Sequence, residues 1–178
     1  YSKAKNFGNN QASFEYILSL DADEVLSENL KKSILNIKNE LNAAYSFNRL
    51  TNYAGKWIKN CGWYPDKKTR IFPKTKAKWE GDFVHEILVL DKDLEIKHLN
   101  GDLLHYSFKS IEDHKQRSDK YAELHAKSML NKGVKFSFLK QIISPLARFL
   151  KDFFIKTGFL DGKAGFTICL ISAKAVFL

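Results

Sequence analysis

The stretch Phe14–Glu24, FEYILSLDADE, is an apolar run that stops at three acids. Its nearly continuous apolar residues, Tyr16, Ile17, Leu18 and Leu20, favour a short strand that is covered on both faces, as in α/β proteins. Carboxylates just beyond such a strand lie where open α/β sheets bind ligands, and Mg²⁺ and Mn²⁺ prefer oxygen ligands of this kind. The stretch therefore predicts an α/β enzyme that uses a metal and acts on phosphates. The alternative is a solvated acidic turn that caps the next helix.

The composition sets broad limits on the class of protein. A chain of 178 residues with 44% hydrophobic residues can form one domain with a proper core. The formal net charge of +9 favours an anionic partner, which could be a nucleic acid, an anionic membrane or a phosphorylated substrate. Cys61 and Cys169 are far apart and lack metal-type spacing, so a disulfide framework or zinc site is not expected and a reducing cytosol fits.

No signal peptide opens the chain, and the longest apolar segment, 164–178, is too short for a spanning helix and contains Lys174. Because the sequence starts without Met and stops in mid-pattern, we expect a fragment.

Local patterns predict the order of helices and strands. We expect a helix tail or loop over Ser2–Ala12, a helix over Glu28–Asn39 capped by Ser27, strands at Ala44–Leu50, Arg70–Phe72 and Phe83–Leu90, two short strands around the Asn100-Gly101 turn within Glu95–Phe108, and a helix from Ser110 to Asn131 that ends at Gly133.

Aromatic and basic residues are dense between Tyr53 and Phe72, in YAGKWIKNCGWYPDKKTRIF. Trp57, Trp63 and Tyr64 stand among lysines and Arg70, which suits binding of a sugar ring or its phosphates. A hairpin with aromatic cross-strand pairs explains the pattern equally well. Stacking on nucleic-acid bases is a third reading.

A second acidic cluster follows in AKWEGDFVHEILVL, where Trp79, Glu80, Asp82, His85 and Glu86 lie close together. A carboxylate beside a histidine in aromatic surroundings suits a general base whose pKa is raised by partial burial. A structural histidine or a surface turn is the alternative. Further on, His105 in LLHYSF could complete a metal shell or pack in the core.

Aromatic and aliphatic residues alternate with Lys and Arg from Val134 onward. Pro145 is expected to open or kink a helix there. Leu146, Phe149, Leu150, Phe153 and Phe154 share one face of this helix, while Arg148, Lys151 and Lys156 are available to phosphates. Such a segment can lie in a membrane interface or pack back on the core.

The motifs SKAKNFGNNQASFEYILSLDADE, GKWIKNCGWYPDKKTRIF, WEGDFVHE, LLHYSF and GFLDGKAGF, in this order, resemble inverting family 2 glycosyltransferases of GT-A fold, in particular the lipopolysaccharide core glucosyltransferase branch. The resemblance implies a mixed sheet flanked by helices. It assigns 1–133 to a partial GT-A catalytic domain that lacks its first nucleotide-binding βαβ unit, and 134–178 to a basic amphipathic helical segment available for membrane association.

The resemblance also implies a function. A hexosyl group would move with inversion from a UDP-glucose-like nucleotide-diphosphate sugar to a lipopolysaccharide-core or other lipid-linked acceptor, in the cytoplasm or on the inner face of its membrane. Asp23 and His105 would bind Mg²⁺ or Mn²⁺, Asp21 would lie near the ribose and diphosphate, and Glu86 would be the base, with Asp82 as its rival and His85 orienting it. The predicted substrate-binding residues are Asp21, Trp57, Trp63, Tyr64, Arg70 and Trp79.

Two other functions stay open from the residues alone. Paired acids that bind two metal ions, beside a basic surface, also suit a nucleotidyltransferase. A non-catalytic remnant that binds a membrane or nucleic acid is the third hypothesis, although nucleic acid is not the expected partner.

Overall fold

The computed structural model describes residues 2–81, 86–133 and 137–177. The chain divides into two compact units. We call Tyr1–Arg49 with Asp66–Leu104 the sheet unit, and Leu50–Pro65 with His105–Leu178 the helical unit. The fold is α/β, a curled mixed sheet flanked by helices, which confirms the expected class and is consistent with a partial GT-A-like fold. The predicted domain boundary at 133/134 lies within the helical unit and stays a prediction.

The main sheet has six strands. Their order is β1 (Tyr16–Leu18), β5 (Asp66–Pro73), β3 (Ala44–Tyr53), β8 (Ile96–Phe108) and β2 (Glu24–Leu26), with β4 (Lys56–Ile58) paired to β3. Both β1 and β3 run antiparallel to β5. A separate antiparallel pair joins β6 (Ala77–Glu80) to β7 (Ile87–Leu90), and a short 3₁₀ turn, η1 (Lys74–Lys76), leads into it.

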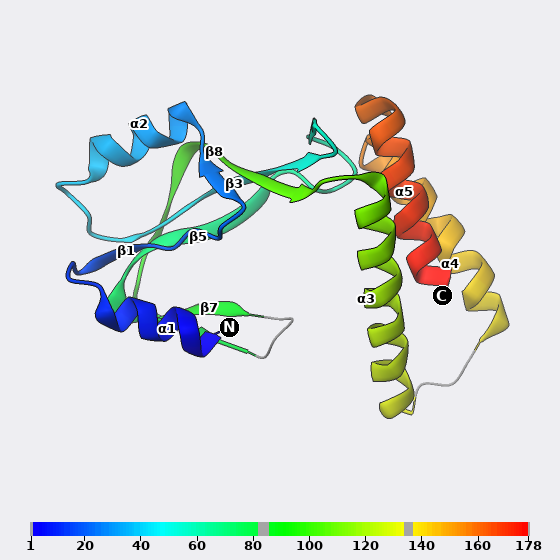
Figure 1. The fold of residues 1–178 in the computed structure, drawn as a ribbon, viewed down its shortest axis with the longest axis horizontal. Coiled ribbons are helices and arrows are strands. Elements are labelled where there is room, and N and C mark those ends of the chain that lie inside the picture. Colours follow the sequence, from blue (N-terminus) through cyan, green and yellow to red (C-terminus); the bar gives the residue numbers. More distant parts are fainter. Residues whose placement is uncertain (1, 82–85, 134–136, 178) are drawn as a thin grey trace. The chain divides into compact units, whose positions relative to one another are not determined.

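Each face of the sheet unit has its own apolar cluster, because neighbouring residues on a strand point to opposite faces. On one face, Leu30 of α2 (Glu28–Ile37) is fully buried in a cluster that includes Phe47 and Ile71. On the other face, Phe72 packs with Trp79 of β6. Figure 1 shows α2 on one side of the sheet, and α1 (Ser2–Gln11) with the β6–β7 pair on the other.

The helical unit gathers α3 (Ile111–Asn131), α4 (Phe138–Leu150) and α5 (Gly162–Phe177), as Figure 1 shows. A π-helical turn, η2 (Lys151–Ile155), and a 3₁₀ turn, η3 (Gly158–Asp161), connect α4 to α5. Within the described residues, no helix is long and apolar enough to cross a bilayer.

The base of α5 packs tightly around two glycines and two thiols. A Cβ atom on Gly165 would overlap the carbonyl oxygen of Gly158, and one on Gly158 would lie 2.9 Å from the Sγ atom of Cys169. Cys61 and Cys169, distant in sequence, are buried and reduced with their Sγ atoms 3.8 Å apart. No residue larger than glycine fits at positions 158 and 165 without movement of the backbone or the thiols.

Both capped helices are confirmed, with small differences at their ends. The Ser27 hydroxyl accepts a hydrogen bond from Leu30 N at 3.3 Å, and the Ser110 hydroxyl accepts one from Asp113 N at 3.1 Å. The strand expected at Ala44–Leu50 continues to Tyr53 as β3. Pro145 lies inside α4.

Two predictions about strands are wrong. The chain does not turn at Asn100-Gly101, because β8 passes through Gly101, which has φ +105°. A Cβ atom there would lie 2.7 Å from Leu30 Cα, so the glycine permits the close approach of α2. The strand expected to be covered on both faces is only partly covered, because Leu18 in β1 is 40% exposed at the end of the strand order. Part of the strand expected at Phe83–Leu90 is β7, and residues 82–85 lie outside the described residues.

Candidate functional site

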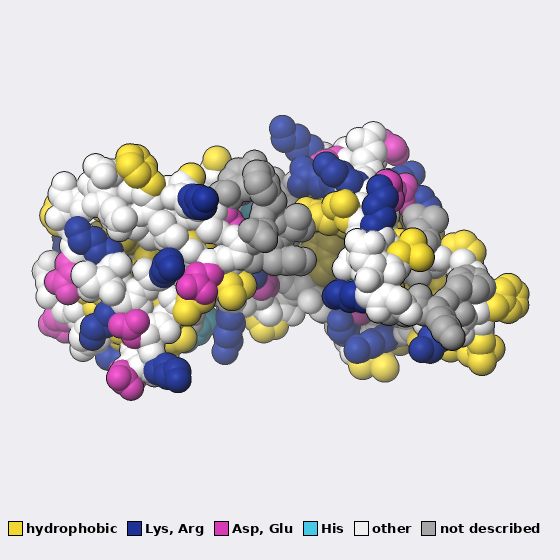
Figure 2. Space-filling view, turned by 90° about the horizontal axis from the view of Figure 1, so that it is seen from below, with side chains coloured by type: hydrophobic (Ala, Val, Ile, Leu, Met, Phe, Trp, Pro, Cys, Tyr) yellow, Lys and Arg dark blue, Asp and Glu magenta, His cyan; other side chains and the backbone are white. Residues whose placement is uncertain are grey.

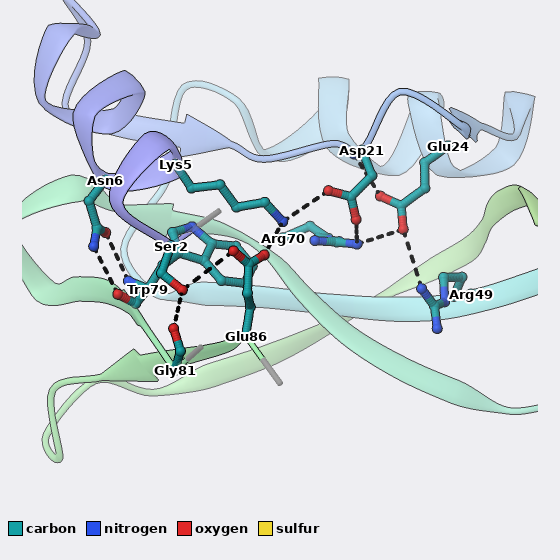
Figure 3. Close-up of polar contacts among 10 residues, drawn as sticks. All are labelled: Ser2, Lys5, Asn6, Asp21, Glu24, Arg49, Arg70, Trp79, Gly81 and Glu86. Carbon is teal, nitrogen blue, oxygen red and sulfur yellow. Dashed lines mark hydrogen bonds and ion pairs between the residues drawn. The ribbon is translucent and has the colours of Figure 1, made fainter. Parts of the chain in front are cut away.

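A pocket of about 620 Å³ opens on the sheet unit. It is lined by side chains of α1, the loop after β1, β3, β5, β6 and the start of β7: Lys5, Asp21, Arg49, Lys67, Lys68, Thr69, Arg70, Trp79, Glu86, Ile87 and Leu88. Figure 3 shows the polar contacts among them. The pocket brings together Asp21, Arg70, Trp79 and Glu86, four of the residues that the sequence predicts for the site.

Arg70 lies between two carboxylates. Its Nη2 atom is 2.7 Å from Asp21 Oδ2 and 2.6 Å from Glu24 Oε1 (Figure 3). Glu24 lies in β2 with its side chain fully buried, and its Oε2 accepts a hydrogen bond from Asp21 N at 3.0 Å. Arg49 approaches the same glutamate at 3.7 Å. These contacts fix the acidic loop, so Glu24 has a positioning role.

Lys5 joins the two acidic clusters. Its Nζ atom is 3.0 Å from Asp21 Oδ1 and 3.3 Å from Glu86 Oε2, and it lies 4.4 Å from the centre of the Trp79 ring (Figure 3). A cation over an aromatic face is attracted by the ring quadrupole. One lysine of α1 therefore contacts three of the predicted site residues.

Opposing effects act on the pKa of Asp21. Burial raises it, but the hydrogen bond from Lys5 and the positive charge of Arg70 outweigh burial and hold the pKa of this carboxyl below its ordinary value. Asp21 is therefore ionised at neutral pH, with both oxygens bound to cations.

The position of Lys5 depends on how α1 is held against β6. Asn6 Nδ2 donates to the carbonyl oxygen of Trp79 at 2.8 Å, and Trp79 N donates to Asn6 Oδ1 at 2.9 Å. At the start of the helix, the Ser2 hydroxyl lies 3.4 Å from Glu86 Oε1 and donates to Gly81 O at 2.8 Å. Trp79 itself is buried, with its ring edge-on to Phe72.

The other predicted aromatic residues belong to the helical unit. Trp57 packs edge-to-face with Tyr106 at 5.3 Å between ring centres, and Trp63 stacks with Phe108 at 5.4 Å. Tyr64 lies in the loop before β5. Trp57 and Trp63 therefore pack on aromatic residues of β8, and a sugar-binding role for Trp57, Trp63 and Tyr64 stays a prediction.

The predicted metal ligands lie in different units. Asp23 is exposed in the turn before β2, and His105 lies in the part of β8 that belongs to the helical unit. Across residues 2–81, 86–133 and 137–177, no three His, Cys, Asp or Glu side chains form a group that could hold a metal. Mg²⁺ held through one or two carboxylates and substrate phosphates needs no such group, so a metal-binding role for Asp23 stays a prediction.

Two predicted residues of the second acidic cluster, Asp82 and His85, lie outside the described residues. Lys5, Glu24 and Arg49 were not predicted for the site. The sequence predicts only a helix tail or loop over Ser2–Ala12, and nothing local pairs Lys5 with acids 16 and 81 residues away.

Comparisons with known proteins bear on the family. No protein-family model matches the chain. Proteins named uncharacterized glycosyltransferases in Rickettsia prowazekii (strain Madrid E) and Rickettsia typhi (strain ATCC VR-144 / Wilmington) are each 31% identical to it over 189 residues. One of the same name in Rickettsia felis (strain ATCC VR-1525 / URRWXCal2) is 30% identical. All three match 100% of this chain, which spans 65% of the length of the first two and 67% of the third. The chain belongs to this family of glycosyltransferases.

Proposed function

We propose that the protein transfers a hexosyl group, with inversion, from a nucleotide-diphosphate sugar to a lipid-linked or lipopolysaccharide-core acceptor, as a GT-A enzyme of family 2 in the cytoplasm. The membership in a glycosyltransferase family supports sugar transfer. The observation that carries the rest is the pocket of the sheet unit, where cations converge on two separate carboxylates. The pocket is our candidate for the site of the donor's diphosphate and sugar.

The charges of the pocket suit a diphosphate. Its lining includes five cationic side chains, Lys5, Arg49, Lys67, Lys68 and Arg70, against the carboxylates of Asp21 and Glu86. Charge-assisted hydrogen bonds from Arg and Lys to phosphate oxygens are among the stronger polar contacts in proteins. Cations fixed beforehand around the departing diphosphate would also stabilise the negative charge that grows on it in the transition state.

Glu86 is our choice for the general base. It lies on the opposite side of Lys5 from Asp21, with Lys5 Nζ 3.3 Å from its Oε2 atom (Figure 3). Glu86 would accept the proton of the acceptor hydroxyl as that oxygen bonds to the anomeric carbon and the bond from this carbon to the diphosphate breaks. One displacement of this kind inverts the anomeric centre. Asp82 remains the rival base.

Asp23 would hold Mg²⁺ or Mn²⁺ together with the phosphates of the donor, and Asp21 would lie near the ribose and diphosphate. When bound, the ion would neutralise charge on the diphosphate as a Lewis acid. His105 remains a proposed ligand of the metal or the diphosphate.

The test measures turnover of a UDP-sugar by the full-length protein. We expect activity only with Mg²⁺ or Mn²⁺, loss of activity in Asp23→Ala, and a kcat about 10²- to 10⁴-fold lower in Glu86→Gln with donor affinity retained. The matched control is Glu80→Gln, because Glu80 is an exposed carboxylate of β6 outside the pocket lining. Turnover without metal would refute the proposed cofactor, and a fully active Glu86→Gln variant would transfer the role of base to Asp82.

A further inference from the structure

The outward side of α4 is an exposed apolar face. Five apolar residues of α4 follow the helical repeat and so share one side of the helix: Leu139, Ile142, Ile143, Leu146 and Leu150. Their exposed fractions run from 44% to 67%. Phe149, at the edge of this face, packs on the buried cluster around Tyr53 and Ile168. We call these five residues the α4 face.

Exposed apolar side chains continue beyond the α4 face within the helical unit. Phe138 precedes it, and Phe154 and Ile155 of η2 follow it, with exposed fractions of 57% to 78%. In Figure 2, hydrophobic side chains (yellow) stand at the surface of the helical unit among Lys and Arg side chains (dark blue). Several exposed apolar side chains gathered in one segment are typical of an interaction surface.

The exposed charges of residues 137–177 are positive, although one of them, Lys174, pairs with Asp119 of α3. Residues 137–177 contain six Lys or Arg, at positions 140, 148, 151, 156, 163 and 174, and two acids, Asp152 and Asp161. Both acids are buried, at 2% and 5% exposed. Asp152 is paired with Arg148 and Lys156, and Asp161 accepts a hydrogen bond from Asn60 N. The charge that this segment presents to solvent is therefore positive.

We propose that the α4 face docks onto an anionic lipid bilayer. An amphipathic helix with Leu and Phe on one side and Lys or Arg beside them lies in the plane of a membrane interface, where its apolar groups enter the lipid and its cations meet anionic headgroups. A second copy of this chain is a poorer occupant, because two such faces would bring like charges together. The docking is a binding property, so it stands or falls separately from the sugar transfer.

The experiment measures sedimentation of the 178-residue chain with vesicles. One set is phosphatidylcholine alone, and the other contains one quarter phosphatidylglycerol. We expect about tenfold tighter binding to the anionic vesicles, weakened by added salt because ions screen exposed charges. Leu139→Glu and Ile143→Glu should each reduce this binding about tenfold or more. Phe14→Glu, a matched change at an 81% exposed residue of the sheet unit, should leave it unchanged.

A further variant separates charge from apolar insertion. Lys151→Gln combined with Lys163→Gln should remove most of the preference for anionic vesicles and keep the weaker binding to neutral ones. Circular dichroism confirms that each variant is folded. Equal vesicle binding by Ile143→Glu and the parent chain would overturn the proposal. It would also fall if light scattering found a dimer that Ile143→Glu converts to a monomer, because the α4 face would then belong to a second copy.

Discussion

Arg70 is a buried cation that pairs with two carboxylates, those of Asp21 and Glu24. Its removal should leave the negative charge of these carboxylates less well neutralised. We expect Arg70→Met to lower the free energy of unfolding by about 3 kcal/mol, because Glu24 would keep only the more distant Arg49. Urea denaturation followed by circular dichroism measures this. Lys127→Met is the control, since it breaks an ion pair with Glu123 in which both side chains are 66% exposed. A loss no larger than in this control would mean that the buried network does not stabilise the fold.

Asp21 should make the protein sensitive to acid. Its pKa is raised by burial but lowered more by Lys5 and Arg70, so it lies below the value in the unfolded chain. The stability that Asp21 contributes is then fully present above the unfolded pKa of about 3.9 and is lost as the pH falls through the lower, folded pKa. Asp21→Asn should therefore flatten the fall in unfolding free energy below about pH 5. Urea titrations at a series of pH values measure this slope, and an unchanged slope would contradict the assignment.

The junction between α2 and β8 should tolerate no side chain at Gly101. Gly101→Ala would force a residue with Cβ into φ +105° and against the backbone of Leu30, so we expect a loss of about 3 kcal/mol of stability. Gly55→Ala separates the two causes, because Gly55 has φ +90° with nothing within 4 Å of a Cβ atom. Thermal unfolding should show a clearly smaller effect in Gly55→Ala. Equal effects would mean that backbone strain alone, without the close approach, sets the cost.

Elements defined by nearby residues were predictable from the sequence, and elements defined by distant contacts were not. The helices after Ser27 and Ser110 begin where a hydroxyl caps them, and a cap acts within three residues. Gly101 was misread as a turn, because a turn and the close approach of another element both require glycine and only the approach of α2 distinguishes them. The partial exposure of β1 depends on which strands lie beside it, which its own apolar run cannot specify.

The candidate site follows the same division. Asp21, Arg70, Trp79 and Glu86 were predicted from the acids after an apolar run, the aromatic and basic stretch, and the second acidic cluster. Their actual partners were not: Lys5 comes from a polar helix with no local signal of function, and Arg49 looks like an ordinary strand residue. Ion pairs between residues tens of positions apart depend on the packing of α1 and β3, which local pattern does not specify.

The whole molecule carries a formal net charge of +9, so we expect anions to bind it. Binding to the native state should raise the free energy of unfolding. If inorganic diphosphate binds the native pocket, a concentration of a hundred times its Kd should raise the unfolding free energy by about 2.7 kcal/mol. Thermal shift measurements at low salt test this. Lys5→Met should weaken the shift, whereas Lys163→Met, at an exposed lysine of α5, should preserve it. If both variants respond alike, the effect comes from overall charge and the pocket is not the site.

The contact between Gly158 and Gly165 affects how a saturation-mutagenesis screen of this protein should be read. Since no larger residue fits at either position, nearly every substitution there should abolish activity as completely as a change in the pocket. An activity screen alone would rank these two glycines with the residues that perform the chemistry. A parallel measurement of cellular abundance would separate the groups, because variants at 158 and 165 should disappear from the soluble protein while Glu86 variants persist at normal levels.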